Sequence, residues 1–125
     1  MSKELIIRKC DSCGAIVSVL EECNCSCGFE CCGAKMRKLE PNTVDAAVEK
    51  HVPVYGIVGD KIKVSVNHVM EEEHYIEWIA FVRDNRQCKV FFKPGETPEC
   101  TFKYVPGSKL YAYCNKHALW MTEVK

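Results

Sequence analysis

The sequence has no long hydrophobic run. No stretch of its 125 residues approaches the roughly 18 uncharged apolar residues that a membrane-spanning helix needs. The opening residues, Met1 to Arg8, contain no apolar core of the kind that signal peptides carry. We therefore expect a soluble, cytoplasmic protein with no membrane partner.

The sequence also has no excess of charge of either sign. It contains 17 basic and 17 acidic side chains. Six of each occur through Glu40, and eleven of each follow it. A broad nucleic-acid-binding surface requires a local excess of Lys and Arg. We therefore expect no nucleic-acid partner.

Cysteine, in contrast, is abundant. The chain has ten cysteines, and seven of them lie between Cys10 and Cys32. In a chain without an export signal, such a cluster indicates metal ligation or redox chemistry rather than a disulfide framework. The first forty residues also contain few large apolar side chains, and a fold with so small a core needs a metal or disulfides.

The segment Glu40-Pro41-Asn42 marks a linker between two predicted domains, residues 1–40 and 41–125. Pro41 disfavours a helical conformation at the residue before it. Asn42 or Thr43 can cap a short helical turn, which we expect over Val44–Val48 and which must end before Pro53.

From Val54 onward, short alternating segments are separated by turn residues, which predicts an antiparallel β-sandwich and a mainly β fold class. In residues 61–68 the apolar side chains occupy even positions and His68 shares their parity, so one face of this strand is buried. Five further strands are expected, at residues 75–82, 88–92, 100–105, 110–114 and 119–124.

The N-terminal cysteines have the spacing of a metal site. Cys10 and Cys13, followed by Gly14, form a knuckle in which two thiolates can bind one ion. Cys31 and Cys32 supply a second pair, which predicts a four-thiolate site for iron or zinc.

Five other cysteines have no such pattern around them. Cys23, Cys25 and Cys27 compete for the same site, and we expect them to be spare loop thiols rather than primary ligands. Cys88 and Cys100 stand alone in predicted strands, where a cysteine is most often a small buried hydrophobe, and we assign them no role.

The chain has only four histidines, at positions 51, 68, 74 and 117. His51 follows the expected helical turn, His68 lies on an inward parity and His74 ends an acidic loop. Cys114 and His117 have the spacing of a ligand pair. Imidazole and thiolate together suit iron, copper, nickel or zinc, so the residues alone predict a metal site in the β domain.

These motifs, taken in order, resemble the desulfoferrodoxins, the two-iron form of superoxide reductase. The resemblance extends over nearly the whole chain, and the segments that carry it are Cys-Asp-Ser-Cys-Gly (10–14), Cys-Cys-Gly (31–33), Glu-Lys-His-Val-Pro (49–53), Val-Asn-His-Val-Met (66–70), Glu-Glu-His-Tyr-Ile (72–76) and Cys-Asn-Lys-His (114–117). The sequence departs from the family pattern between the two cysteine pairs, where its segment is longer and carries three extra cysteines.

The resemblance implies a desulforedoxin-like four-cysteine iron domain over residues 1–40 and an immunoglobulin-like β-sandwich over residues 41–125. It implies that the four histidines form the equatorial plane of a reactive iron, with Cys114 on the axis. Glu49 then matches the glutamate that can occupy the open position in the ferric state, and Lys50 matches the lysine beside the substrate site.

The expected activity is the one-electron reduction of superoxide to hydrogen peroxide without release of dioxygen. The family implies two iron ions per chain, a rubredoxin-like electron donor and a homodimer. Two alternatives stay open at this point: an electron-transfer protein that binds no substrate, and a zinc-binding structural or metal-buffering module.

Overall fold

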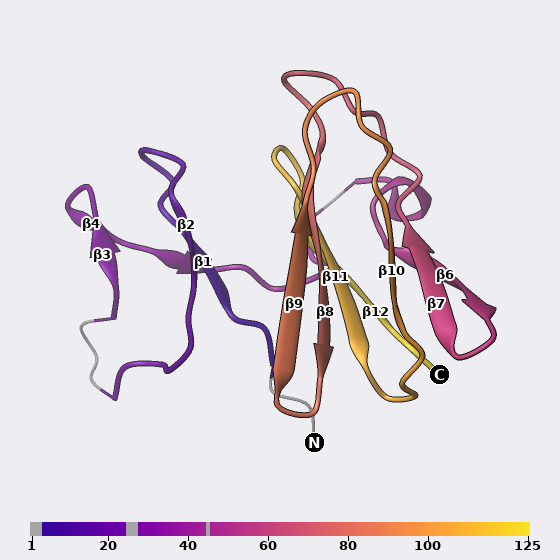
Figure 1. Ribbon diagram of the computed structural model, residues 1–125. Coiled ribbons are helices and arrows are strands. Elements are labelled where there is room, and N and C mark those ends of the chain that lie inside the picture. The colour runs from indigo at the N-terminus through magenta and orange to yellow at the C-terminus, as the bar shows by residue number, and fades with distance from the viewer. Residues whose placement is uncertain (1–3, 25–27, 45) are drawn as a thin grey trace. The chain divides into compact units, whose positions relative to one another are not determined.

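The computed structural model describes residues 4–24, 28–44 and 46–125 (Figure 1), so Cys25 and Cys27 lie outside the described residues. The chain divides into two compact units, Glu4–Glu40 and Pro41–Lys125. Among the described residues, no helix is long and apolar enough to cross a membrane.

The small unit consists of short antiparallel strands. Its three-stranded sheet has the order β2-β1-β5, and a separate hairpin pairs β3 with β4. The bounds of these strands are β1 Ile7–Lys9, β2 Ile16–Ser18, β3 Glu30–Cys31, β4 Ala34–Lys35 and β5 Arg37–Lys38. Its buried apolar side chains are few, namely Leu5, Ile7, Cys10, Val19, Met36 and Leu39.

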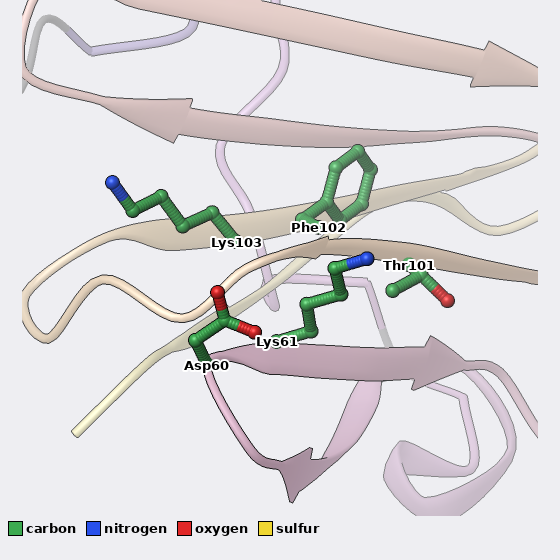
Figure 2. A pocket seen from close by; sticks show the side chains of 5 residues that line it. All are labelled: Asp60, Lys61, Thr101, Phe102 and Lys103. Atoms are coloured by element: carbon green, nitrogen blue, oxygen red, sulfur yellow. The ribbon is translucent and has the colours of Figure 1, made fainter.

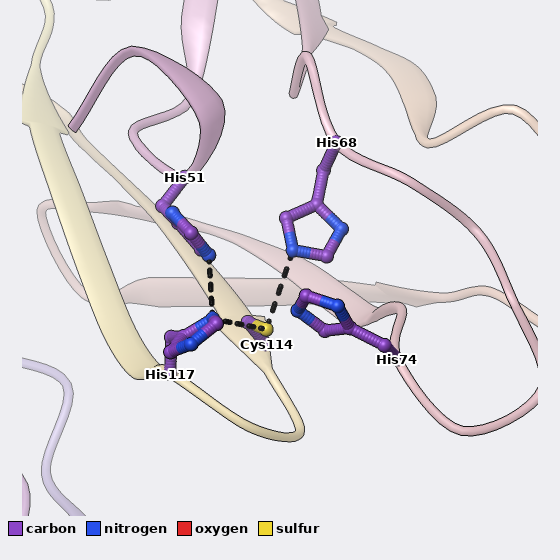
Figure 3. A group of neighbouring side chains, drawn as sticks. All are labelled: His51, His68, His74, Cys114 and His117. Atoms are coloured by element: carbon purple, nitrogen blue, oxygen red, sulfur yellow. Dashed lines mark hydrogen bonds between the residues drawn. The ribbon is translucent and has the colours of Figure 1, made fainter. Parts of the chain in front are cut away.

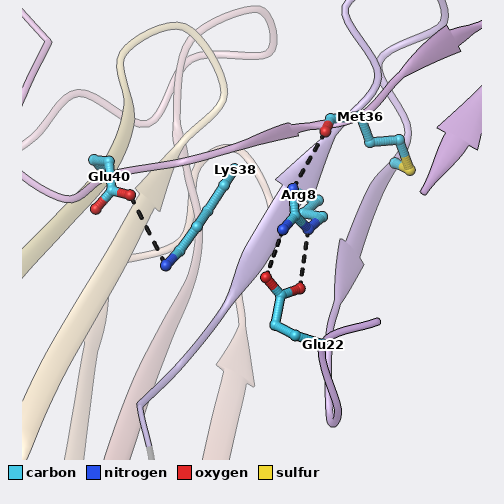
Figure 4. A network of polar contacts seen from close by, with 5 residues as sticks. All are labelled: Arg8, Glu22, Met36, Lys38 and Glu40. Atoms are coloured by element: carbon cyan, nitrogen blue, oxygen red, sulfur yellow. Dashed lines mark hydrogen bonds and ion pairs between the residues drawn. The ribbon is translucent and has the colours of Figure 1, made fainter. Parts of the chain in front are cut away.

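A polar network supplements this small core (Figure 4). Arg8 on β1 donates two hydrogen bonds to the Glu22 carboxylate, at 3.2 and 2.5 Å, and a third to the Met36 carbonyl at 3.4 Å. Its guanidinium also lies 5.5 Å from the centre of the Phe29 ring. Arg8 therefore connects three segments that have little apolar surface of their own to bury.

The large unit is a β-sandwich of seven strands. One sheet has the order β10-β7-β6 and the other β12-β11-β8-β9, all antiparallel. The bounds of the strands are β6 Val54–Val58, β7 Lys61–Ser65, β8 Ile76–Arg83, β9 Arg86–Phe91, β10 Glu99–Lys103, β11 Lys109–Cys114 and β12 Ala118–Glu123. The predicted mainly β fold class is confirmed.

The core of the sandwich lies between the two sheets. Ile62 and Val64 on β7 are fully buried and Val66 nearly so, while Lys61 and Lys63 are exposed, as the alternation in the sequence predicts. The rings of Phe81 on β8 and Phe102 on β10 stack with centroids 4.8 Å apart. This contact joins the two sheets.

The helical turn expected over Val44–Val48 is wrong in its position. The structure instead has a 3-10 helix, η1, at Val48–Lys50. Asn42 does not cap a helix, because its side chain accepts a hydrogen bond from the Met121 N–H and donates one to the Met121 carbonyl. Asp45, inside the expected turn, lies outside the described residues.

The expectation of burial is also wrong for Cys88, which is exposed, whereas Cys100 is half-buried. Cys88 lies on β9, the edge strand of its sheet. An edge position cannot be recognised from an isolated cysteine in a sequence.

Candidate metal centres

Five potential ligands meet at one end of the sandwich (Figure 3). They come from the end of η1, the segment after β7, the turn before β8, the end of β11 and the turn between β11 and β12. The residues are His51, His68, His74, Cys114 and His117, whose ligand atoms all lie within 4.8 Å of one another. The structure thus brings together all four histidines and the cysteine that the sequence singled out.

The four imidazole rings form a closed cycle. Each ring meets the next edge to face, with centroids 4.6–5.0 Å apart and interplanar angles of 71–86°. The order around the cycle is His51, His68, His74, His117 and back to His51. Every ring therefore has two imidazole neighbours, as four equatorial ligands around one ion would have.

Hydrogen bonds determine which nitrogen of two rings faces the centre. The Nδ1–H of His51 donates to the Ala47 carbonyl at 2.7 Å, and the Nδ1–H of His68 donates to the Val69 carbonyl at 2.5 Å. A carbonyl only accepts, so Nδ1 carries the proton in both rings and Nε2 is left as the ligand atom. Such contacts are the usual orienting bonds of metal-binding histidines.

The other two histidines present different nitrogens. Nδ1 of His117 lies 3.0 Å from Nε2 of His51. Nε2 of His74 is buried without a hydrogen-bond partner among the described residues. A buried polar atom without a partner is costly, and a metal ion would satisfy this one.

The thiol of Cys114 completes the cluster and is fully buried. Its Sγ lies 3.3 Å from Nε2 of His68 and 3.8 Å from Nδ1 of His117. Burial favours the neutral form of each group. It therefore raises the pKa of Cys114 and lowers the pKa of His68 and of His117. Neutral imidazoles are the form that binds metal, and a cation would offset the cost of a buried thiolate.

These donors fit a single transition-metal ion. Neighbouring ligands about 2.1 Å from a metal lie roughly 3 Å apart when they meet at right angles, and the nitrogens of His51 and His117 have this spacing. Four imidazoles and one thiolate suit iron, copper, nickel and zinc.

Asn115 holds the loop that carries His74. Its side-chain oxygen accepts from the Tyr75 N–H at 3.0 Å, and its amide donates to the Glu73 carbonyl at 2.9 Å. Backbone hydrogen bonds between Glu71 and His74 close the same turn, at 3.0 and 3.1 Å. The sequence did not predict this role, because its only local signal is the position of Asn115 beside Cys114.

Glu49 and Lys50 lie on η1 immediately before His51, and both are exposed. No hydrogen bond or ion pair found in the described parts of the chain joins either residue to the cluster. Their place in the fold is therefore set by the turn that ends at His51.

The second cluster lies in the small unit and consists of Cys10, Cys13, Cys31 and Cys32. Sγ of Cys31 lies 3.7 Å from that of Cys13 and 3.9 Å from that of Cys32. The Gly14 N–H donates to the Cys10 carbonyl at 2.9 Å, and Gly14 has a φ of +81°, which closes the knuckle.

Cys10 and Cys31 have pKa values shifted in opposite directions. The backbone N–H groups of Cys13 and then Ser12 stabilise a thiolate at Cys10 and lower its pKa to about 7. The neighbouring sulfurs of Cys10 and Cys13 raise the pKa of Cys31 to about 12. Several adjacent thiolates need a cation between them, and a set of four sulfurs fits iron or zinc.

Cys23 is exposed and does not belong to the four-sulfur cluster. The prediction that it is not a primary ligand agrees with this placement. For Cys25 and Cys27 the same prediction concerns positions outside the described residues.

A pocket of about 490 Å³ lies between the start of β7 and the end of β10 (Figure 2). His68 follows the opposite end of β7. Its lining consists of Asp60, Lys61, Thr101, Phe102 and Lys103. This set contains neither a nucleophilic thiol nor an imidazole, so the metal cluster is the better candidate for chemistry.

Comparison with known proteins agrees with this geometry. A model of the desulfoferrodoxin family matches residues 43–123. A desulfoferrodoxin from Syntrophotalea carbinolica is 42% identical over 127 residues, covering 98% of this chain and 99% of its own length. Another, from Desulfarculus baarsii, is 44% identical over 129 residues with the same coverage.

A solved structure extends the similarity to the fold. The superoxide reductase from Treponema pallidum matches with a TM-score of 0.68 and 26% identity, covering 97% of this chain and 100% of that one. The family match, the near-complete coverage and the two clusters agree with one another, and the chain belongs to the desulfoferrodoxin family.

Proposed function

We propose that this chain is a superoxide reductase that adds one electron and two protons to superoxide and releases hydrogen peroxide without dioxygen. The closed cycle of four imidazoles with the buried sulfur of Cys114 carries the proposal. The Treponema pallidum protein of matching fold is a superoxide reductase, which supports the same activity.

The ligands of the reactive iron are His51, His68, His74, His117 and Cys114. When bound, ferrous iron supplies the electron and a Lewis-acidic position for an anionic substrate. Four neutral imidazoles and one thiolate leave a formal charge of about +1 on the centre, which attracts superoxide. The thiolate of Cys114 donates electron density, which favours release of a reduced anion.

Lys50 is the proposed substrate-side cation. Its ammonium carries donors on a flexible stem, so it can attract superoxide and hold a water molecule that delivers a proton. Glu49 would supply a carboxylate ligand to the oxidised iron. The exposed position of both residues, directly before a ligand, supports these roles.

The four cysteines of the small unit form the proposed second iron site, in a desulforedoxin-like domain of residues 1–40, with the sandwich of residues 41–125 as the catalytic domain. Zinc accepts the same four ligands. Metal analysis together with iron–thiolate absorption distinguishes the two ions at this site.

Each turnover consumes one electron, so a donor is required, and a rubredoxin-like protein is the proposed partner. Homodimer formation and a cytoplasmic location, where thiols stay reduced, belong to the same proposal.

Product analysis tests the proposed function. Ferrous protein mixed with superoxide, in the presence of a reductant that recycles the iron, should yield one hydrogen peroxide per superoxide and no dioxygen. Formation of one dioxygen for every two superoxide ions would indicate dismutation and overturn the proposal.

A further inference from the structure

Trp120 lies between two of the ligand-bearing segments. Its side chain is almost fully buried, with 1% of its surface exposed, and it contacts both His51 and His117. We propose that Trp120 is a positioning residue of the reactive centre, which fixes His51 and His117 and through them the turn that carries Glu49 and Lys50. This inference rests on the proposed function.

The first contact acts on the ring of His51. The indole stacks on the imidazole with centroids 4.9 Å apart and an interplanar angle of 24°. A second constraint on the same ring comes from the hydrogen bond between Nδ1 of His51 and the Ala47 carbonyl. A ring held on its face and at one nitrogen has little freedom to rotate, so its Nε2 stays directed at the centre.

The second contact acts on the backbone of His117. The indole N–H of Trp120 donates to the His117 carbonyl at 2.9 Å. The next residue, Ala118, has a φ of +64°, a left-handed conformation that is unfavourable for alanine. The hydrogen bond therefore helps to hold a strained turn, and this turn presents Nδ1 of His117 to the cluster.

The segment that carries His51 is attached to β12 on both sides of Trp120. The Asn42 N–H donates to the Leu119 carbonyl, and the Asn42 side chain pairs with the backbone of Met121. Farther along, the Thr122 hydroxyl donates to the Pro53 carbonyl at 2.7 Å. The indole on β12 thus acts on a segment, from Asn42 to Pro53, whose two ends are already anchored to the same strand.

The position of the substrate-side turn follows from the position of His51. The backbone of η1 closes by hydrogen bonds from Lys50 to Ala47 and from His51 to Val48, at 3.2 and 3.1 Å. Since the ring of His51 is itself bonded to Ala47, moving the ring moves the turn. Glu49 and Lys50 are then placed by an indole that neither of them touches.

The chain offers a matched control in its other tryptophan. Trp78 is also buried, with 5% of its surface exposed, and stacks on Tyr113 at 5.6 Å. Among the described residues, its ring contacts are with Tyr113 and Lys89 and not with any of the five ligands. Trp78→Phe therefore removes the same atoms from the sandwich at a position that stacks on none of the ligands.

The experiment compares Trp120→Phe, Trp120→Leu and Trp78→Phe with wild type, all loaded with ferrous iron. Loss of iron from the histidine site to an excess of chelator, the midpoint potential of that iron and the unfolding free energy of the metal-free proteins are measured. We expect iron release to be about tenfold faster in Trp120→Phe and faster again in Trp120→Leu, with a displaced potential in both.

Trp78→Phe should keep the wild-type release rate and potential even where its metal-free stability falls as far as that of Trp120→Phe. If both phenylalanine variants release iron in proportion to their loss of stability, with unchanged potentials, Trp120 is only a packing residue. If Trp120→Leu does not fold, Trp120→Phe, which keeps an aromatic face, decides the question. Failure of wild type to hold iron at this site would instead overturn the proposed function together with this inference.

Discussion

At the scale of single residues, the proposed function assigns a task to an exposed side chain as well as to the five ligands. Lys50 lies on the solvent-exposed turn before His51, and its proposed task is to attract an anion and to deliver a proton. A charge that acts in this way affects the association rate more than it affects folding.

We therefore expect Lys50→Ala to slow the reaction of ferrous protein with superoxide by about tenfold at low ionic strength, with a smaller difference at high salt. Lys116→Ala is the control, since Lys116 is an exposed lysine beside the ligand His117. Rapid mixing measures both rates. Equal slowing in the two variants would mean that the reaction rate depends on the total positive charge near the site and not on the position of Lys50.

Cys100 gives a residue-scale prediction about pH. Burial is the main cause that raises its pKa from 9.0 to about 12. The folded state therefore keeps this proton at a pH where the unfolded state has released it. The contribution of the protonated Cys100 thiol to the free energy of unfolding is thus complete below pH 9 and is lost as the pH rises toward 12.

The difference in unfolding free energy between wild type and Cys100→Val should accordingly change between pH 8 and pH 10.5, with wild type losing more. Urea titrations of the metal-free proteins across roughly this range provide the measurement. Parallel pH profiles for the two proteins would show that the thiol does not titrate differently in the folded state.

At the scale of elements, some of the fold could be predicted from the sequence and some could not. The parity of Ile62, Val64 and Val66 was sufficient to assign the buried face of β7, because a half-buried strand repeats every two residues. The turn before His51 was misplaced, since the side chain of Asn42 binds Met121, which lies far away in the sequence.

The candidate site shows the same division. Its five ligands stand in recognisable local motifs, so their numbers could be read from the sequence. The supporting roles of Trp120 and Asn115 could not be predicted from the sequence, because each residue acts through contacts with segments that are remote in the chain. Local sequence patterns identify the residues that can bind a metal. The residues that hold those ligands in position are identified only by contacts in the folded structure.

The cysteine knuckle of the small unit gives an element-scale prediction. Gly14 has open space around it but a φ of +81°, so Gly14→Ala introduces backbone strain of about 1–2 kcal/mol without a steric clash. We expect the four-cysteine site to release its metal about tenfold faster.

Gly56→Ala is the control for this change, because it also adds one methyl group into open space but at a residue without a positive φ. Loss of iron–thiolate absorption in the presence of a chelator follows the release. An unchanged rate in Gly14→Ala would show that the knuckle adapts to a side chain.

At the scale of the whole molecule, the two metal sites belong to different units. All five ligands of the reactive centre come from Pro41–Lys125, and all four cysteines of the other site come from Glu4–Glu40. Within the described ranges, neither site takes a ligand from the other unit. Their chemistry should therefore be separable by mutation.

We expect Cys13→Ser to remove or alter the metal of the small unit while the reaction of the ferrous histidine site with superoxide stays within about twofold of wild type. Metal analysis and rapid mixing on the same sample give both values. A large loss of superoxide reduction would show that the four-cysteine site takes part in the reaction itself.

The most direct test of the proposed activity is the Cys114→Ser variant, because Cys114 supplies the single thiolate of the reactive centre. The ferrous variant is mixed rapidly with superoxide, and its rate and peroxide yield are compared with those of wild type. We expect wild type to consume superoxide with one peroxide formed for each, and the variant to lose this reaction. A variant as fast as wild type would contradict the assignment of the histidine–cysteine cluster as the site of superoxide reduction.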